Sequence, residues 1–382
     1  MNTPKRLAVL AAFSGQGGVE RMVLNLLEGF AAYDIDVDLL PIVRKHYPLP
    51  RIANPRARIL PFAARHSSLV APELAGYLGR ERPDVLLAVR DRGIRAAVMA
   101  RRLAGVDVPV VGNLHSLLGP ALAEKGWLQR WWRLWPMGWI YGRVDRLIAV
   151  SDGVADDIAA IARFPRENIR VVRNPVVDEP MLAAAREPVE HPWLNDGELP
   201  VVMGAGRLSA EKDFATLIRA FAGLNRIRPC RLIILGEGKQ RPALTQLVAD
   251  LGLLDVVDLP GYTPNPYAWL ARASLFALSS VREGSGNVLT EAMALGVPVV
   301  STDCPTGPRE MLRDGRYGQL VPVGDDGRLA TAMAETLTQP IEADVLRAAV
   351  GDYRVERSAR GYLAALGLLP AGMRPEPLPA AE

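Results

Sequence analysis

Two glutamates, Glu283 and Glu291, lie in a glycine-rich stretch that could hold a phosphorylated sugar. Carboxylate oxygens are strong acceptors for the hydroxyl donors of a sugar. Gly284 and Gly286 allow a ligand to approach the backbone closely. A helix is expected to begin near Gly286, and the free N–H groups of its first turn favour an anion such as phosphate. Glu283 in the loop and Glu291 on the helix could therefore hold such a ligand at both ends.

The apolar runs around this stretch predict that it connects two buried strands. Ala273 to Leu278 precede it and Val297 to Val300 follow it. In an open α/β sheet, loops of this kind lie at the carboxyl ends of the strands, where ligands bind. The alternative is an ordinary helix start with two surface glutamates.

Two cations, Arg207 and Lys212, follow another predicted strand that begins at Val201. Placed at the start of a helix, they could neutralise a diphosphate that develops negative charge. The alternative for both residues is a surface salt bridge.

Both motifs resemble those of a known family. The sequence E-G-x-G-N-V-L-x-E-A-M-A-x-G-x-P-V-V from Glu283 and the sequence G-R-L-x-x-x-K-x-x-x-x-L-I-x-A-F from Gly206 are similar to signatures of the retaining glycosyltransferases of family 4, which have the GT-B fold. Ser285 departs from this pattern, in which a bulkier residue is usual, and this departure bears on the shape of the expected sugar pocket.

The resemblance implies two Rossmann-like α/β domains that face a central cleft. The N-terminal domain, residues 1–175, would bind the acceptor, and the C-terminal domain, residues 176–351, would bind a nucleotide sugar. A helix over 352–369 would cross back to the first domain. Residues 370–382, rich in Pro, Ala and Glu, predict a disordered tail. A length of 382 residues also favours two domains over one.

The resemblance also implies roles for individual residues. Arg207 and Lys212 would hold the donor diphosphate, Glu283 the sugar hydroxyls and Glu291 the ribose. A Gly-Gly loop of the first domain would close over the donor. The predicted donor-binding residues are Gly17, Gly18, Gly236, Gly238, Gly286, Asn287, Val288, Leu289 and Glu291. The predicted catalytic residues are His115, Arg207, Lys212 and Glu283.

His115 is the predicted catalytic residue of the first half. It directly follows the apolar run Val110–Leu114, and a histidine at the carboxyl end of a strand can donate to a phosphate or a sugar hydroxyl near neutral pH. The family has a donor-contacting histidine in this region. The alternative is a loop histidine with a structural role.

Apolar periodicity predicts the elements that position these residues. The predicted strands include Leu7–Phe13, Val37–Val43, Val85–Val89, Val108–Leu114, Arg146–Val150, Ile169–Val172, Leu232–Leu235 and Val256–Leu259. The predicted helices include 69–80, 93–104, 326–338 and 352–366. Five prolines between Pro175 and Pro200 predict a linker.

The segment 127–141 holds five of the seven tryptophans, with cations around them. Aromatic and cationic side chains together suit a membrane interface. The alternatives are stacking on single-stranded nucleic acid and a tryptophan-rich core helix. We expect residues 125–143 to make peripheral contact with a membrane, and we expect no nucleic-acid partner.

Charge and cysteine content indicate the compartment and the partners. Residues 1–175 hold 25 Lys and Arg against 16 Asp and Glu, a net charge of +9, whereas residues 176–382 have a net charge of −6. The basic half would be drawn to anionic lipid, an anionic acceptor or nucleic acid. Two cysteines and no run of eighteen apolar residues favour a cytoplasmic protein on the inner face of the membrane.

The expected activity is transfer of a sugar from a nucleotide-diphospho-sugar, with uridine as the expected base, to a hydroxyl of a glycan or lipid-linked acceptor in cell-surface polysaccharide or lipopolysaccharide biosynthesis. The resemblance implies a retaining, hexosyltransferase-type enzyme. No D-x-D pair stands at the end of a predicted strand, so neither a metal nor another cofactor is expected. Cys304, in a turn between prolines, is not expected to be a nucleophile. The alternatives are a sugar-nucleotide 2-epimerase and a two-lobed sugar-binding protein.

Overall fold

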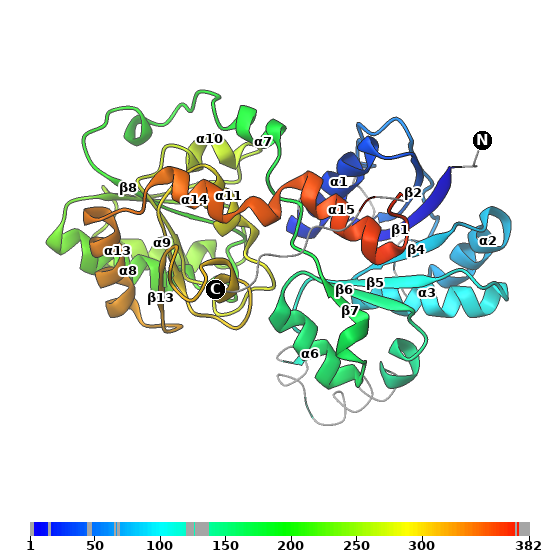
Figure 1. Cartoon of the computed structure of the whole chain (residues 1–382). Coiled ribbons are helices and arrows are strands. Elements are labelled where there is room, and N and C mark those ends of the chain that lie inside the picture. Colours follow the sequence, from blue (N-terminus) through cyan, green and yellow to red (C-terminus); the bar gives the residue numbers. More distant parts are fainter. Residues whose placement is uncertain are drawn as a thin grey trace. The chain divides into compact units, whose positions relative to one another are not determined.

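The computed structural model describes residues 4–13, 17–43, 48–64, 66, 69–119, 126, 137–370 and 373. The chain forms two compact α/β units (Figure 1). Of the described residues, one unit contains those up to Pro175 and those after Arg354, and the other runs from Val176 to Arg354. Each unit has one sheet, and all strand pairs within it are parallel.

The first unit has a seven-stranded sheet with the strand order β3-β2-β1-β4-β5-β6-β7. Its strands are β1 (Lys5–Phe13), β2 (Ile35–Val43), β3 (Ala57–Ile59), β4 (Val85–Val89), β5 (Val110–Leu114), β6 (Arg146–Ala149) and β7 (Ile169–Val171). Its helices are α1 (Gly18–Gly29), α2 (Ala71–Glu81), α3 (Arg90–Ala104), α6 (Asp152–Ala162) and α15 (Val355–Leu366).

Both faces of this sheet are buried, as the uninterrupted apolar runs require. Alternate residues of β1 point to opposite faces: Leu7 and Val9 join one core with α1 and α15, whereas Ala8 and Leu10 join another with α2 and α3. The helices therefore cover both faces of the sheet.

The last helix, α15, is part of the first unit. A methyl group added at Gly29 of α1 would lie 2.8 Å from Val355 and 2.9 Å from Ala359, so a glycine is needed for the two helices to pack closely. Tyr362 on α15 is fully buried, and its hydroxyl accepts a hydrogen bond from Asn113 Nδ2 at 3.0 Å.

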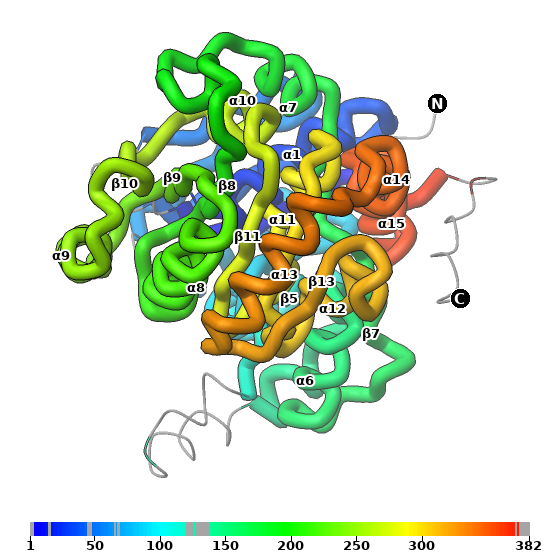
Figure 2. The backbone as a smooth tube through the Cα atoms, turned by 90° about the vertical axis from the view of Figure 1, so that its left-hand side faces the viewer, coloured from blue at the N-terminus to red at the C-terminus, as the bar shows by residue number. Residues whose placement is uncertain are grey.

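The second unit has a six-stranded sheet with the order β10-β9-β8-β11-β12-β13. Figure 2 shows β10, β9, β8 and β11 side by side in this order. Its strands are β8 (Val201–Ala205), β9 (Arg231–Leu235), β10 (Val257–Gly261), β11 (Leu275–Leu278), β12 (Val299–Thr302) and β13 (Gln319–Val321). Its helices are α7 (Glu179–Ala184), α8 (Phe214–Ile227), α9 (Arg241–Asp250), α10 (Pro266–Leu270), α11 (Asn287–Ala294), α12 (Pro308–Met311), α13 (Asp326–Thr338) and α14 (Ala343–Ala349).

The stretch between Pro175 and Pro200 was wrongly predicted to be only a linker. Val177 and Met181 are buried in the core of the second unit. Pro180 lies in the first turn of α7, where the missing N–H of a proline leaves no hydrogen bond unmade. These prolines are therefore compatible with a packed segment.

A buried carboxylate stabilises the edge of the first sheet. Asp38 of β2 is 1% exposed, and it accepts hydrogen bonds from Tyr77 Oη at 2.5 Å and from both Nε and Nη2 of Arg58, at 2.5 and 2.9 Å. Together with Asp34 and Asp36 it forms a D-x-D-x-D pattern at the amino end of β2. Since all three carboxylates pair with arginines, this pattern serves the sheet edge.

We expect replacement of Asp38 by alanine to lower the stability of the first unit by about 2–3 kcal/mol, because the buried Tyr77 hydroxyl would lose its acceptor. The melting temperature should fall by about 5–10 °C. The control is Asp36→Ala, which removes a more exposed carboxylate of the same strand and should shift the melting temperature by less than about 2 °C. Equal shifts in the two variants would contradict this role of Asp38.

Of residues 125–143, predicted to contact a membrane, only Gly126 and residues 137–143 lie among the described residues. Ile140 and Tyr141 are buried, whereas Trp139 is 37% exposed and has the guanidinium carbons of Arg143 and Arg102 at 4.2 and 5.6 Å from its ring centroid. This part of the segment therefore has both a core face and an exposed aromatic face. No helix in the described part of the chain combines the length and apolar character needed to cross a membrane.

Candidate functional site

The centre of the candidate site is an ion pair between Lys212 and Glu283. Lys212 Nζ lies 2.5 Å from Glu283 Oε1, and the two side chains are only 22% and 11% exposed. Ser280 Oγ donates to the same carboxylate oxygen at 2.7 Å. Both donors bind Oε1, so Oε2 of Glu283 has no hydrogen-bond partner among the residues that the structure describes.

The N-terminal cap of helix α8 fixes the backbone beside Lys212. Asp213 caps this helix, and its carboxylate accepts from Thr216 N at 3.3 Å and from Thr216 Oγ1 at 2.7 Å. Asp213 has φ +43°, a left-handed conformation that aspartate tolerates better than most residues. Ser279 Oγ donates to the Lys212 carbonyl at 2.9 Å, which links the end of β11 to the loop after β8.

Two threonines hold the loop that carries Glu283. Thr306 Oγ1 donates to the Glu283 carbonyl at 2.5 Å, and Thr302 Oγ1 donates to the Ser280 carbonyl at 2.6 Å. Thr302 ends β12 and Thr306 lies in the loop after it. These two residues therefore fix the backbone of the loop that carries Glu283. No sequence pattern points to Ser280, Thr302 or Thr306, because nothing in their spacing distinguishes them from other hydroxyl-bearing residues.

The backbones of the loops after β8 and β9 approach each other closely at two glycines. A methyl group added at Gly236 would lie 2.0 Å from the Gly206 carbonyl oxygen, and one at Gly238 would lie 2.2 Å from the Leu208 carbonyl oxygen. Leu208 N donates to the Glu237 carbonyl at 2.9 Å. Gly236 and Gly238, predicted to bind donor, are therefore needed at these positions for the two backbones to touch.

Gly206 leaves space for the lysine. A methyl group added there would lie 3.3 Å from Lys212 Cε and 3.5 Å from Cδ. Arg207, the next residue, is exposed and has no ion pair among the described residues. The loop thus carries one paired and one unpaired cation.

Helix α11 begins after Gly286, which has φ +69°. Leu289 is fully buried and its amide donates to the Gly286 carbonyl at 2.8 Å, so this amide is already used within the turn. The amide of Val288 has no partner in the described part of the chain. Asn287 is half-buried, and Glu291 is 8% exposed on the helix. The helix start therefore offers fewer open amides than the predicted set, Gly286 to Leu289, would suggest.

Ser285 lies beside this helix start with an unsatisfied hydroxyl. The residue is 8% exposed, and its buried Oγ has no hydrogen-bond partner among the residues that the structure describes. Its backbone lies against Gly307, where an added methyl group would come within 3.1 Å of the Ser285 carbonyl carbon.

Cys304 is buried near the Lys212–Glu283 pair. Burial and, second to it, the negative charge of Glu283 raise the pKa of its thiol to about 12. A thiol with this pKa carries almost no thiolate at neutral pH, and the thiolate is the nucleophilic form. The burial and raised pKa of Cys304 therefore agree with the expectation that this residue is not a nucleophile.

In the first unit, hydrogen bonds fix the tautomer of His115. Asn113 Nδ2 donates to the Ile148 carbonyl at 3.3 Å, and a carbonyl can only accept, so the amide oxygen faces His115. The ring must then donate from Nε2 to Asn113 Oδ1. The other nitrogen, Nδ1, is buried, has no partner in the described part of the chain and in this tautomer is an acceptor. The neutral ring can accept from a sugar hydroxyl, but its one N–H is not free for the predicted donation to a phosphate.

Burial lowers the pKa of His115 to about 3, and the positive charge of Arg90 adds to the effect. The ring is therefore neutral in the folded protein at pH 5, whereas a histidine in the unfolded chain has a pKa of about 6.5. The unfolded chain binds the extra proton, so this group lowers stability progressively as the pH falls from about 6.5 toward 3.

We expect the melting temperature of the His115→Asn variant to decline less than that of the wild type between pH 7 and pH 5. Replacement of the exposed His66 by asparagine is the matched control and should leave the wild-type pH profile unchanged. Parallel profiles for His115→Asn and the wild type would show that His115 titrates normally.

Gly17 and Gly18 form the start of α1. The Gly17 carbonyl accepts from the amides of Glu20 and Arg21 at 3.0 and 3.1 Å. Residues 14–16 of the predicted Gly-rich loop lie outside the described residues. The first unit thus holds Gly17, Gly18 and His115, and the second holds Arg207, Lys212, Glu283 and Glu291; a donor site between the two units stays a prediction.

The two parallel-sheet units and the motifs around Lys212 and Glu283 define the class as a glycosyltransferase of the GT-B fold. Residues 16–179 match the family described as glycosyltransferase family 4, and residues 199–339 match the one described as glycosyl transferases group 1. A 4-alpha-N-acetylgalactosaminyltransferase of Campylobacter jejuni is 33% identical over 371 residues, covering 90% of this chain and 92% of the relative. The chain belongs to family 4 of the glycosyltransferases and is an enzyme of the hexosyltransferase type.

Other relatives and solved structures agree with this assignment. A lipopolysaccharide core biosynthesis glycosyltransferase of Rhizobium meliloti, LpsE, is 29% identical over 327 residues, covering 85% of this chain and 86% of the relative. The structure of Anabaena HepE in complex with UDP has a TM-score of 0.73 at 19% identity and covers 96% of this chain and 100% of that one. The outer core galactosyltransferase WaaB has a TM-score of 0.70 at 19% identity, with coverages of 95% and 99%. These structures confirm the predicted fold class.

Proposed function

We propose that this enzyme transfers a sugar, with retention of configuration, from a UDP-sugar to a hydroxyl of a lipid-linked or glycan acceptor in lipopolysaccharide or surface polysaccharide biosynthesis. The observation that carries the proposal is the largely buried Lys212–Glu283 pair, with the start of α11 and with Arg207, which has no ion pair among the described residues. This arrangement combines a cationic site for a diphosphate with a carboxylate oxygen for a sugar hydroxyl.

The names of the relatives support the donor and acceptor classes. HepE has been solved with UDP-glucose. The Campylobacter jejuni relative is named for an acceptor that is a saccharide on diphospho-undecaprenol, and the Rhizobium meliloti relative for lipopolysaccharide core biosynthesis. A UDP-sugar and a lipid-linked acceptor are therefore the first substrates to test.

Each group of the site would have a role in the transfer reaction. The acceptor hydroxyl attacks the anomeric carbon, the bond from that carbon to the diphosphate oxygen breaks, and the leaving phosphate takes the proton. Negative charge grows on the leaving group, so fixed positive charge lowers the barrier. Arg207, Lys212 and the open Val288 amide would supply this charge, and Glu283 Oε2 would accept from a sugar hydroxyl.

Glu291 and His115 would accept hydrogen bonds from hydroxyl groups of the donor. Glu291, buried on α11, would accept from the ribose hydroxyls. His115 would accept from a sugar hydroxyl at Nδ1, the ring nitrogen for which the described residues offer no partner. Because two cations are available for the diphosphate, the transfer would not require a metal, and excess EDTA should leave the rate unchanged.

We further propose peripheral attachment to the inner face of the cytoplasmic membrane. Trp139, Met99 and Leu103 are exposed, and Arg102 and Arg143 lie over the tryptophan ring. An aromatic side chain between cations fits the interface of an anionic bilayer. Co-sedimentation with vesicles containing anionic phospholipid should fall in the Trp139→Ala variant, and equal co-sedimentation would contradict this contact.

The decisive experiment is a donor panel of UDP-, GDP- and ADP-sugars, incubated with the enzyme with and without bacterial lipid extract. Release of UDP from one donor only in the presence of lipid would support the proposal, and the anomeric configuration of the product, read by NMR, would test retention. Release of GDP or ADP instead would reject the uridine donor. No release from any donor would reject the proposed substrates.

A further inference from the structure

Thr306 has a backbone conformation that threonine rarely adopts. Its φ is +64°, in the left-handed region, where a β-branched residue is an outlier. Pro305 precedes it in a turn, and at such a position with positive φ glycine or asparagine is the usual residue. The backbone of Thr306 is therefore strained. Strain of this kind persists only where the surrounding contacts determine the conformation.

The side chain of Thr306 makes a contact that a glycine could not make. Its hydroxyl donates to the Glu283 carbonyl at 2.5 Å, and no other described residue donates a hydrogen bond to this carbonyl. Glu283 lies in a loop, outside the helices and strands of the second unit. The threonine hydroxyl therefore provides the hydrogen bond that holds the backbone of the glutamate.

The two residues after this threonine lie against the same loop. A methyl group added at Gly307 would lie 3.1 Å from the Ser285 carbonyl carbon, and one added at Gly286 would lie 4.0 Å from Pro308 Cγ. Together with the threonine hydroxyl, these contacts support the glutamate loop at three points. We call residues 306–308 the supporting segment.

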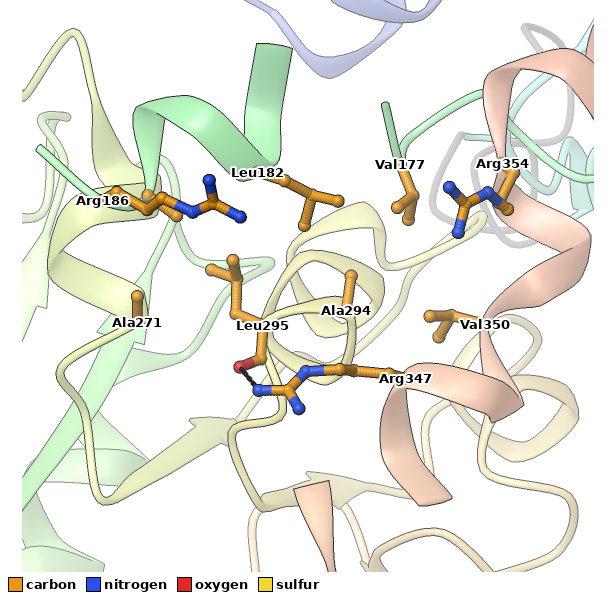
Figure 3. A pocket seen from close by; sticks show the side chains of 10 residues that line it. Val177, Leu182, Arg186, Ala271, Ala294, Leu295, Arg347, Val350 and Arg354 are labelled. Atoms are coloured by element: carbon orange, nitrogen blue, oxygen red, sulfur yellow. Dashed lines mark hydrogen bonds between the residues drawn. The ribbon is translucent and has the colours of Figure 1, made fainter. Parts of the chain in front are cut away.

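Helix α11, which follows the glutamate loop, is held separately at its C-terminal end. Arg347 donates to the Leu295 carbonyl at 3.3 Å, beside the cavity shown in Figure 3. Gly296 lets this arginine come close, since a methyl group added there would lie 2.8 Å from its Nη2. Loss of the threonine hydroxyl is therefore expected to move the loop and to leave the helix, with Glu291, in place.

We infer that Thr306 is a positioning residue for the transferred sugar. It acts through Glu283, whose Oε2 would accept a hydrogen bond from a sugar hydroxyl, so the inference rests on the proposed function of this site. The strained backbone is the condition under which the hydroxyl reaches the glutamate carbonyl. The supporting segment serves the sugar and not the nucleotide, because the predicted ribose contact, Glu291, is on the helix.

Three substitutions separate the hydroxyl from the strain. Thr306→Val keeps the branched shape and removes the hydroxyl, Thr306→Gly removes both the hydroxyl and the strain, and Thr306→Ser keeps the hydroxyl. Turnover of the donor that the panel identifies should fall about ten-fold or more in the valine and glycine variants, because a displacement of about 1 Å can cost a hundred-fold in rate. Thr306→Ser should recover the wild-type rate to within about three-fold.

Stability should not follow the same order as turnover. Glycine adopts a positive φ readily, so Thr306→Gly should melt about 2–5 °C above Thr306→Val. If Thr306 served stability alone, the glycine variant would also be the more active of the two. Wild-type turnover in Thr306→Gly would therefore overturn the inference.

Nucleotide binding distinguishes a role toward the sugar from a role in the whole site. The affinity for the nucleoside diphosphate, measured by isothermal titration calorimetry, should stay within about two-fold of the wild type in Thr306→Gly, and the loss should lie in kcat. A loss of this affinity equal to the loss of turnover would overturn the inference. Thr331→Val is the matched control, because the exposed Thr331 on α13 also donates to a backbone carbonyl, that of Gly327 at 3.2 Å. It should have the wild-type turnover.

The outcomes separate this inference from the proposed function. Unchanged turnover in both the valine and glycine variants of an active enzyme would overturn the inference and leave the proposed function intact, whereas no turnover by the wild type with any donor would reject the proposed function. Hydrogen exchange needs no donor. Peptides that span residues 281–289 should exchange faster in Thr306→Val than in the wild type, and equal exchange would overturn the positioning role whatever the donor.

Discussion

Replacing Lys212 by alanine is expected to lower the rate of donor turnover about a hundred- to a thousand-fold. The ammonium group lies 2.5 Å from Glu283, at the point where the proposed diphosphate would gain negative charge. Loss of one preorganised donor to a developing negative charge costs about 2.7–4 kcal/mol of transition-state stabilisation. The measurement is release of nucleoside diphosphate with the donor and acceptor that the panel identifies.

The effect should be mainly on kcat, because the charge that Lys212 stabilises is largest in the transition state. Lys239→Ala, at an exposed lysine in the loop after β9, is the matched control and should retain the wild-type rate. A Lys212→Ala enzyme within about three-fold of the wild-type rate would exclude the lysine from catalysis.

Loss of the lysine also leaves a carboxylate with a single hydrogen bond, from Ser280, in a site that is largely buried. The stability of the Lys212→Ala variant should therefore fall. The Lys212→Ala/Glu283→Gln double variant separates this effect on stability from the effect on catalysis. The double variant should melt at a higher temperature than Lys212→Ala, because the unpaired charge is gone, while its turnover stays low. Recovery of turnover in the double variant would show that the lysine acts only by neutralising Glu283.

The second large effect is expected at Gly236. A methyl group there would lie 2.0 Å from the Gly206 carbonyl oxygen, and the glycine has φ +131°, so Gly236→Ala combines a backbone clash with strain. The loops after β8 and β9 would have to separate, which would displace the segment that carries Arg207 and Lys212. We expect a loss of about 3 kcal/mol or more in stability and a loss of nucleotide binding.

Two other glycines serve as controls for this substitution. Gly252 has φ +68° with no atom near the added methyl group, so Gly252→Ala measures backbone strain alone, about 1–2 kcal/mol. Gly351 has neither constraint, and Gly351→Ala should have the wild-type melting temperature. A melting temperature for Gly236→Ala as high as that of Gly252→Ala would show that the loops separate at no cost.

The sequence predicted most of the sheet and helix order, because central strands of a parallel sheet are continuous apolar runs. β4 and α13 were predicted with the bounds that the structure has, and β1, β9 and β11 to within two residues. The short edge strands β3 and β13 and helix α14 were not predicted. These elements are short and only partly apolar, so they have no clear period, and pairing with a neighbour forms the two edge strands.

The sequence also identified Lys212 and Glu283 separately, through motifs in which each stands at a fixed place after a strand. Only the tertiary structure joins them, because 71 residues separate them and the parallel order of β8 and β11 brings their loops together. The supporting hydroxyls of Ser280, Thr302 and Thr306 were missed for the same reason.

Tertiary contacts also decided what individual groups can donate or accept. The Ile148 carbonyl orients Asn113, which in turn fixes the tautomer of His115, and no local pattern contains this information. The need for Gly236 arises from another loop. The sequence by itself indicated the strands and helices through local periodicity, and it indicated the family, the fold class and the candidate residues through motifs that resemble those of family 4. The folded chain decided their pairing, burial and protonation, because these depend on atoms that are distant in sequence.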